Sequence, residues 1–196
     1  MKIIGIAGGT KTGKSLFANH LAQFLPSASI LSLDNYFLDK PARIPIEQHN
    51  FYIPTAFDFK SFHIALEDLR KELPVQMPNY DQTKGKRLST VKVVPKKYLI
   101  IEGLYSLMHA SIRSLMSYSF YLESPPDVVL SRFIRGNLQK WNYPLEYSIQ
   151  QYFTFVRPAF YNYVVPTRQH AHLVVTNDYN SGLDLFLQDF LNKYQL

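Results

Sequence analysis

The fold is decided by the stretch KIIGIAGGTKTGKSLFANHLAQFL, residues 2–25. It opens with KIIGIA, an apolar run rich in isoleucine that predicts a buried parallel strand. It closes with SLFANHLAQFL, in which Leu, Phe and Ala recur at helical spacing and predict an amphipathic helix. Between them lies GGTKTGKS, Gly8 to Ser15, which matches the pattern G-x-x-x-x-G-K-[ST]. Strand, glycine loop and helix in this order indicate a phosphate-binding loop.

This loop has the residue types that bind a chain of phosphates. Glycines let backbone N–H groups turn inward around the phosphates, and the N-terminus of the following helix adds partial positive charge. Lys14 can reach the β- and γ-phosphates of a nucleotide, and the Ser15 hydroxyl can ligate Mg²⁺. The predicted nucleotide-binding residues are Gly8, Gly9, Thr10, Lys11, Thr12, Gly13, Lys14 and Ser15.

Two carboxylates stand at the ends of other predicted strands. SILSL, residues 29–33, ends at Asp34, and the apolar run YLIIEG, residues 98–103, contains Glu102. Ligands of open parallel sheets bind beyond the carboxyl ends of the strands, so we expect both acids near the phosphate loop. Asp34 can take a proton from an attacking hydroxyl or help to hold Mg²⁺, and Glu102 is placed as a metal-holding acid. The competing interpretations are a turn-forming aspartate and a strand-end glutamate with a local salt bridge.

Further strand and helix patterns alternate along the chain. We expect a helix over 59–73 with Asp58 as its N-cap, and two strand-like pieces, 75–77 and 88–94, around a polar turn. A strand over 119–122, a helix opened by Pro125 and Pro126, a helix over 144–165 kinked or broken at Pro158, a strand over 172–176 and a core-facing helix over 183–194 follow. The pattern predicts an α/β three-layer fold of the P-loop NTPase type. Its five-stranded, mostly parallel sheet has helices on both faces and a small β-hairpin excursion.

The composition fits one domain covering residues 1–196. The absence of cysteine excludes disulfides and thiolate metal sites and fits a reducing compartment. No apolar run approaches the roughly 20 residues of a membrane span. The chain enters a strand at its N-terminus, which leaves no room for a signal peptide. We therefore expect a cytoplasmic soluble protein without a membrane partner.

The net charge of +6 raises the question of a nucleic-acid partner. Six of the 21 basic residues lie between Lys84 and Lys97, and four lie between Arg132 and Arg157. Neither cluster carries a helix-turn-helix or RNA-recognition motif. We assign these residues to a phosphate site or a solvated surface and expect no nucleic-acid partner.

The helix that follows Pro126 is a candidate lid, covering about residues 126–143. It carries Arg132, Arg135 and Lys140. Arginines near the phosphates can clamp a γ-phosphoryl group during its transfer. The alternative is a solvated helix face.

Six motifs along the chain have a combined resemblance to one family. They are GGTKTGKS, LDNYF, NFYIPTAFD, PNYDQTKGKR, IIEGLY and QYFTFVRPAFYNYVVPTRQHAHLVV. Together they resemble the uridine kinase (uridine–cytidine kinase) family of P-loop kinases over nearly the whole chain. The resemblance implies transfer of the ATP γ-phosphate, with Mg²⁺, to the 5′-hydroxyl of uridine or cytidine in nucleoside salvage. It also allows a homo-oligomer, since family members are often tetramers.

The resemblance implies roles for single residues. Asp34 matches the catalytic base, and Glu102 matches the acid of the strand end E-G. Tyr80 matches a tyrosine that lines the base pocket, and Arg87 matches the arginine that closes the same motif. Tyr36, in LDNYF, is expected beside the substrate.

The acceptor segments, about 34–58 and 74–96, depart from the family pattern. The family has N-F-D-H-P-D-A-F-D, in which a central Asp binds the ribose hydroxyls, and here NFYIPTAFD places Thr55 at that acidic position. Thr55 is thus an expected substrate residue that carries no charge. Gln82 replaces a pocket phenylalanine, and Gly85 replaces a histidine. Losing a hydrogen-bonding group from a polar pocket can change selectivity by orders of magnitude.

The lid also departs from the family pattern. Its motif R-R-x-x-R-D reads RFIRGN here, so Arg132 matches, Phe133 stands for an arginine and Arg135 is one place out of step. A later E-R-G-R reads KWNY, Lys140 to Tyr143. The motif that would bind the nucleotide is therefore intact, whereas the motifs that would bind the acceptor differ from those of the family.

The main expectation is an ATP-dependent small-molecule kinase with Lys14, Asp34, Arg132 and Arg135 as catalytic residues. Nicotinamide riboside kinases share a similar front end, and phosphoribulokinase and pantothenate kinase are more distant alternatives. An ATP-binding protein that has lost transfer activity is suggested by the altered lid. A GTPase-like switch would need an N-K-x-D stretch, which the sequence lacks.

Overall fold

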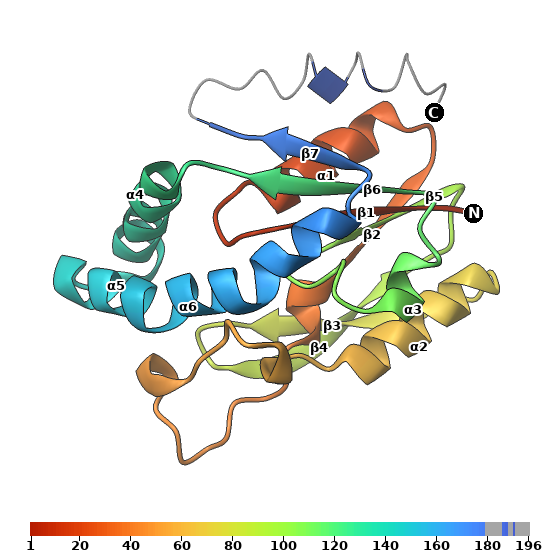
Figure 1. The fold of residues 1–196 in the computed structure, drawn as a ribbon. Coiled ribbons are helices and arrows are strands. Elements are labelled where there is room, and N and C mark those ends of the chain that lie inside the picture. The colour runs from red at the N-terminus through yellow and green to blue at the C-terminus, as the bar shows by residue number, and fades with distance from the viewer. Residues whose placement is uncertain (179–185, 188–189, 191–196) are drawn as a thin grey trace.

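The computed structural model describes residues 1–178, 186–187 and 190 of the chain. Its centre is a sheet of five parallel strands in the order β2-β5-β1-β6-β7 (Figure 1). The strands are β1 (Lys2–Gly8), β2 (Ala28–Ser32), β5 (Tyr98–Glu102), β6 (Tyr118–Glu123) and β7 (Leu173–Thr176). Because all five point the same way, their carboxyl ends meet along one edge of the sheet.

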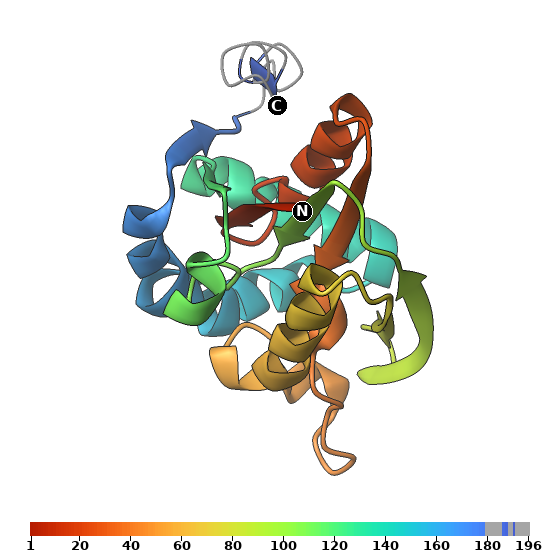
Figure 2. The ribbon, with the colours of Figure 1, turned by 90° about the vertical axis from the view of Figure 1, so that its right-hand side faces the viewer.

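Apolar side chains alternate between the two faces of the sheet. In β1, Ile3 packs into one buried cluster and Ile4 into the other, as the two-residue period of a strand requires. The cluster of Ile4 includes residues of α1 (Lys14–Phe24). The cluster of Ile3 includes residues of α2 (Phe59–Arg70) and α3 (Ala110–Arg113). Figure 2 shows α1 on one side of the sheet and α2 on the other, which confirms the three-layer α/β prediction.

The predicted hairpin forms a separate two-stranded sheet beside α2. It pairs β3 (Val75–Asp81) with β4 (Lys86–Val93) in antiparallel fashion. The strand β3 is longer than the piece predicted from the sequence. Asp58 caps α2, as predicted, because its carboxylate accepts a hydrogen bond of 3.0 Å from the backbone N–H of Ser61.

The segment from 126 to 170 is mostly helical. It contains α4 (Pro126–Gly136), a π-helical turn Asn137–Trp141, α5 (Leu145–Gln151) and α6 (Arg157–Ala159). The chain does not leave the helix at Pro158, where we expected a kink or break. Instead, π-helical turns Tyr152–Val156 and Phe160–Val164 lie on either side of α6. Their wider hydrogen-bonding pattern accommodates the missing proline N–H without ending the helix.

Most of the helix predicted over 183–194 lies outside the described residues. Of that segment, Leu187 and Phe190 are buried in the cluster that contains α1. No helix in the described part of the chain is both long and apolar enough to cross a membrane. The prediction of a single domain over 1–196 stays a prediction.

The packing of α1 on the sheet predicts different costs for two phenylalanines of the same helix. Phe17 is fully buried with its ring centroid 5.1 Å from that of Phe120, whereas Phe24 is 39% exposed. Phe17→Ala should lower the free energy of unfolding by about 3–5 kcal/mol, because it leaves a cavity beneath α1. Phe24→Ala is the matched control and should cost less than about 1 kcal/mol. Urea unfolding followed by circular dichroism measures both, and equal losses would contradict the packing described.

Candidate active site

The phosphate loop joins β1 to α1 at the carboxyl edge of the sheet. Gly8 and Gly13 have φ angles of 141° and 92°, in the region that disfavours side chains. A Cβ on Gly8 would lie 2.1 Å from the carbonyl oxygen of Leu122, so glycine is required there. Lys11 also has a positive φ, of 59°. The loop thus depends on its glycines at the positions that the motif predicts.

Side-chain hydrogen bonds hold the loop in shape. The buried Lys14 ammonium donates to the carbonyl oxygen of Gly9 over 2.7 Å, and the Thr12 hydroxyl donates to the same oxygen over 2.8 Å. The Asn177 amide, just beyond β7, donates to the Thr12 carbonyl oxygen over 2.8 Å. The loop is therefore fixed both from within and from a strand far away in the sequence.

Glu102 lies beneath the loop at the end of β5. It is opposite Ser32 of β2 in the register of the sheet and is 3% exposed. Its two carboxylate oxygens accept hydrogen bonds from the hydroxyls of Ser15, over 3.3 Å, and Ser32. The acid predicted at this strand end is thus in direct contact with the predicted metal-binding serine.

Asp34 lies in a 3₁₀ turn, Leu33–Tyr36, that follows β2. Although the residue as a whole is partly buried, its Oδ1 atom is completely buried and has no hydrogen-bond partner within the described structure. Burial, with a further contribution from the nearby Glu102 carboxylate, raises the pKa of Asp34 to about 6, against an opposing effect of Lys14. Burial lowers the pKa of Lys14, while Asp34 and Glu102 act in the opposite direction.

These residues fit the ligand preferences of Mg²⁺. Mg²⁺ is bound through one or two carboxylates, phosphate oxygens and waters rather than by an all-protein cage. The Ser15 hydroxyl and the carboxylates of Glu102 and Asp34 are oxygen donors of this kind, and Asp34 Oδ1 has unused acceptor capacity. Among the described residues, no group of three or more His, Asp or Glu side chains forms a metal cage. A metal that binds together with phosphates agrees with both observations.

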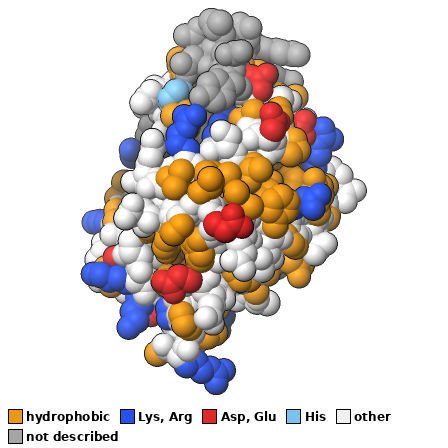
Figure 3. All heavy atoms as spheres, turned by 90° about the vertical axis from the view of Figure 1, so that its left-hand side faces the viewer, with side chains coloured by type: hydrophobic (Ala, Val, Ile, Leu, Met, Phe, Trp, Pro, Cys, Tyr) orange, Lys and Arg blue, Asp and Glu red, His pale blue; other side chains and the backbone are white. Residues whose placement is uncertain are grey.

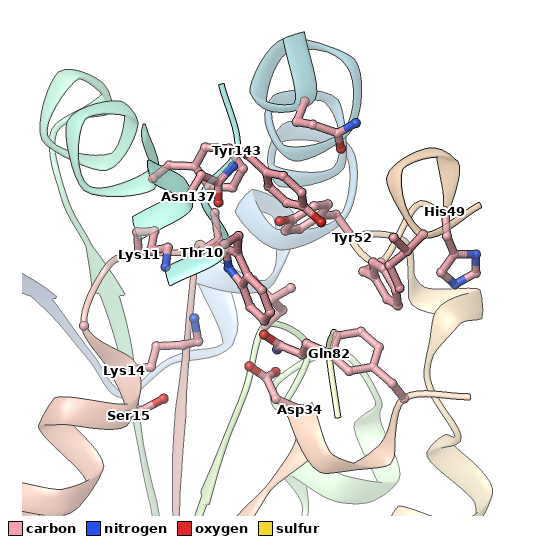
Figure 4. Close-up of a pocket in the computed structure, with 18 of the residues that line it drawn as sticks. Thr10, Lys11, Lys14, Ser15, Asp34, His49, Tyr52, Gln82, Asn137 and Tyr143 are labelled. Carbon is pink, nitrogen blue, oxygen red and sulfur yellow. The ribbon is translucent and has the colours of Figure 1, made fainter. Parts of the chain in front are cut away.

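A cavity of about 380 Å³ opens in front of the loop (Figure 4). Lys14, Ser15 and Asp34 point into it from the carboxyl edge of the sheet. Its other walls come from the 37–52 segment, the β3–β4 turn, α4 and the helical segment after α4. These walls are formed by Phe37, Ile46, His49, Phe51, Tyr52, Gln82, Phe133, Asn137, Trp141, Tyr143, Tyr147 and Gln151. The volume lies within the usual range of about 300–1,000 Å³ for small-molecule sites.

The structure does not place the four predicted substrate residues on this cavity. Thr55 is exposed in a 3₁₀ turn, Pro54–Ala56, and Tyr36 and Tyr80 are buried in the core. The Arg87 guanidinium donates to the Phe37 carbonyl oxygen over 2.9 Å. It also forms an ion pair of 3.1 Å with the carboxylate of Asp58, the N-cap of α2. Arg87 and Tyr80 thus contact Phe37, a residue of the cavity wall, without lining the cavity themselves.

Phe51 and Tyr52 of the NFYIPTAFD motif line the cavity, and of these two Tyr52 falls on an acidic position of the family pattern. It stands at the first acidic position of the family pattern, whereas the sequence analysis singled out the second, Thr55. Burial raises the pKa of Tyr52, as does the proximity of Asp34, Tyr147 and Tyr143. The signal in the sequence was an aromatic residue in a place where the family has an acid.

His49, Trp141 and Tyr147 also line the cavity, and no motif in the sequence predicts them there. Trp141 and Tyr143 belong to KWNY, which we had noted only as a departure from the lid pattern. Tyr147 lies on α5, and its hydroxyl donates to the Glu47 carbonyl oxygen over 3.2 Å. A hydrogen bond therefore joins α5 to the 37–52 segment, and both contribute residues to the cavity wall.

The two predicted lid arginines do not line the cavity. Arg132 donates to the backbone carbonyl oxygens of Lys11, Asn177 and Asp178 over 3.3, 3.4 and 3.0 Å. Arg135 lies with Leu130, Ile134 and Leu138 in a groove along α4. Figure 3 shows the side of the molecule on which α4 and α5 lie, where apolar side chains form a broad patch.

Comparisons with known proteins agree with this geometry. Residues 3–180 match the phosphoribulokinase/uridine kinase family. The chain is 34% identical over 195 residues to a uridine kinase of Borrelia garinii subsp. bavariensis, covering 98% of this chain and 95% of the relative. It is 30% identical over 198 residues to uridine-cytidine kinase B of Dictyostelium discoideum, covering 97% and 82%. The solved structure of a possible uridine kinase from Bacillus stearothermophilus has the same fold. Its TM-score is 0.64 at 19% identity, with coverage of 88% of this chain and 87% of that one.

The raised pKa of Asp34 predicts a measurable effect on stability. The folded state holds the Asp34 proton more tightly than the unfolded chain. Above pH 6 Asp34 is ionised, and its buried charge destabilises the fold. Below pH 4 Asp34 is protonated, and this destabilisation disappears. Asp34→Asn should therefore raise the free energy of unfolding at pH 7 by about 1–3 kcal/mol. The gain should shrink as the pH falls from 7 towards 4. Thermal unfolding in the presence of a chelator measures it, and a gain independent of pH would contradict the assigned pKa.

Proposed function

Because the chain belongs to the phosphoribulokinase/uridine kinase family, we propose that it transfers the γ-phosphate of ATP to the 5′-hydroxyl of uridine or cytidine. At the coarser level it is a P-loop small-molecule kinase. The observation that carries the proposal is the unpartnered, buried Oδ1 of Asp34, which lies at the cavity together with Lys14. A carboxylate with free acceptor capacity beside a phosphate loop is suited to receive the proton of an attacking hydroxyl.

Asp34 and Lys14 have distinct roles in the proposed transfer step. The acceptor hydroxyl donates its hydrogen bond to Asp34, and its oxygen attacks the γ-phosphorus while the proton passes to the carboxylate. The bond from the γ-phosphorus to the bridging oxygen breaks, and the electron pair stays on ADP. Lys14 and the loop N–H groups stabilise the negative charge of the phosphates. The raised pKa of Asp34, about 6, lets it be ionised at neutral pH and still bind a proton well.

Mg²⁺ would be held by the Ser15 hydroxyl, with Glu102 and Asp34 as supporting carboxylates. When bound, it neutralises charge on the β- and γ-phosphate oxygens. Glu102 orients Ser15 by accepting a hydrogen bond from its hydroxyl, so that a lone pair of the Ser15 oxygen stays available.

The cavity walls support a flat acceptor. The rings of Phe37, Tyr52, Trp141 and Tyr143 can stack on a nucleobase, and the amide of Gln82 can bond to its polar edge. Asp34 is the only carboxylate among the described residues that line the cavity. This supports binding of the base through its faces rather than through charge.

A nicotinamide riboside acceptor is the second candidate. Its pyridinium ring is cationic, and aromatic faces such as those of Tyr52 and Trp141 attract cations. The lysines of the phosphate loop repel a cation, which favours the neutral pyrimidine.

The experiment that tests the proposal measures ADP release from ATP and Mg²⁺ against a panel of acceptors. The panel holds uridine, cytidine, purine ribonucleosides, deoxynucleosides, nicotinamide riboside, ribulose 5-phosphate and pantothenate. The highest kcat/KM is expected with uridine or cytidine. Turnover on another acceptor alone would assign the rewritten pocket to that compound, and no turnover with retained ATP binding would indicate a protein that has lost transfer.

Asp34→Asn should lower kcat on the best acceptor by roughly 10²–10⁴-fold, because the amide cannot accept the hydroxyl proton. ATP affinity should remain within a few-fold of the wild-type value. Asp127→Asn, an exposed position on α4, is the matched control and should keep full activity. Full activity of Asp34→Asn would remove Asp34 from the mechanism.

The cavity lining predicts that Tyr52, not Thr55, determines acceptor affinity. Tyr52→Ala should raise the acceptor KM by roughly 10-fold or more, because a stacked ring contributes about 1–3 kcal/mol. The KM for ATP should change by less than about 2-fold. Thr55→Ala, at an exposed position three residues further along, in the turn Pro54–Ala56, should change neither constant. Steady-state kinetics with both variants decides between the two positions, and a larger effect of Thr55→Ala would restore the expectation from the motif.

A further inference from the structure

The transferred phosphate needs cationic groups besides Lys14, because its oxygens carry the charge of the transition state. The arginines of α4 do not line the cavity in this structure. Arg132 is engaged with three backbone carbonyl oxygens, and Arg135 lies in the groove along α4. The candidates for this role are therefore the other cations at the cavity.

Lys11 is a second cation at the cavity. Its side chain lines the same cavity as Lys14, and Figure 4 shows both ammonium groups on the phosphate-loop side. The Lys11 ammonium nitrogen would be 2.9 Å from a Cβ placed on Gly136, at the end of α4. Lys11 thus reaches from the loop to the helix that covers it.

Gly136 is complementary to Lys11. Its backbone is helical, with φ −62° and ψ −38°, so its conformation does not require glycine. Its lack of a side chain instead leaves room for the Lys11 ammonium. When R-R-x-x-R-D is written over RFIRGN, the third arginine falls on Gly136. The lid thus lacks an arginine at position 136, and the Lys11 ammonium, which comes from the phosphate loop, lies beside that position.

The charges around Lys11 favour a polyanionic ligand. Partial burial, Lys140 and Lys14 all lower the pKa of Lys11. No carboxylate in the described part of the chain forms an ion pair with it. Lys140 is itself held over the Trp141 ring at 4.6 Å, beside the cavity. The positive charges of Lys140 and Lys14 repel that of Lys11, and a phosphate chain placed among the three lysines relieves that repulsion.

The backbone at Lys11 adds a second, independent observation. Its φ of 59° is in the left-handed region, which a non-glycine residue rarely occupies. Arg132 donates to its carbonyl oxygen over 3.3 Å and so stabilises this conformation. Strained residues persist where the surroundings hold them, and they cluster at functional sites.

We propose that Lys11 is a catalytic cation that contacts the γ-phosphoryl oxygens during transfer and supplies the positive charge expected from a lid arginine. The proposal rests on the proposed kinase function. The bond changes are those of the transfer step, with the acceptor proton on Asp34 and the electron pair on ADP. Lys11 keeps its proton throughout and acts only by its charge.

The first test replaces Lys11 by methionine, which keeps the length of the side chain and removes the charge. Lys11→Met should lower kcat by about 10²–10³-fold, the usual loss of one transition-state donor. ADP affinity, measured by calorimetry, should change by less than about 3-fold, because ADP lacks the γ-phosphate. Lys84→Met, at an exposed hairpin position, is the matched control and should keep full activity. Lys11→Arg, which keeps the charge, should retain most of kcat.

The second test exploits the contact with Gly136. Gly136→Arg in the Lys11→Met background should recover at least about 10-fold of the lost kcat, because it returns a cation to the same place. The same substitution in the wild-type background should bring no gain, since Lys11 already occupies the space. Lys11→Gln is measured beside Lys11→Met, so that a folding defect in one variant leaves the other to decide.

The outcomes separate this inference from the proposed function. If the wild-type protein turns over and Lys11→Met keeps kcat within about 3-fold, the inference is wrong and the kinase function stands. If the wild-type protein transfers to no acceptor, the ratio of ATP to ADP affinity still decides. Lys11→Met should then lose roughly 10-fold or more of the preference for ATP, and an unchanged ratio would overturn the contact with the γ-phosphate.

Discussion

The close approach of Lys14, Glu102 and Asp34 at one edge of the sheet is the constraint on which the rest of the site depends. Five parallel strands bring their carboxyl ends together there, so residues far apart in the sequence become neighbours. Burial and the nearby Glu102 carboxylate raise the pKa of Asp34, and the Lys14 ammonium opposes that effect. Asp34 Oδ1 keeps unused acceptor capacity in this arrangement, and the proposed transfer step uses it.

The phosphate half of the site could be predicted because its signals are local or follow from topology. The glycine loop needs positive φ angles at fixed positions, and only glycine adopts them at low cost. The alternation of Ile3 and Ile4 between two clusters follows from the period of a strand. The positions of Asp34 and Glu102 followed from the rule that parallel strands end at the same edge.

The acceptor half could not be predicted in the same way, because its side chains are directed by packing between distant segments. The motif placed Thr55 at the substrate, but the turn Pro54–Ala56 exposes it and leaves Tyr52 on the cavity. Arg87 is engaged with Phe37 and Asp58, contacts that bring together residues about 30 to 50 positions apart. Helical spacing likewise could not show that Arg132 binds carbonyl oxygens beyond β7. Pro158 is accommodated by π-helical turns that no pattern in the sequence predicted.

The most direct test of the central claim identifies the product of the reaction. The protein is incubated with ATP, Mg²⁺ and an equimolar mixture of uridine and cytidine, and the products are analysed by ³¹P NMR and mass spectrometry. The account predicts a nucleoside 5′-monophosphate and ADP in equal amounts. ADP with inorganic phosphate alone, formed at the same rate without nucleoside, would contradict it.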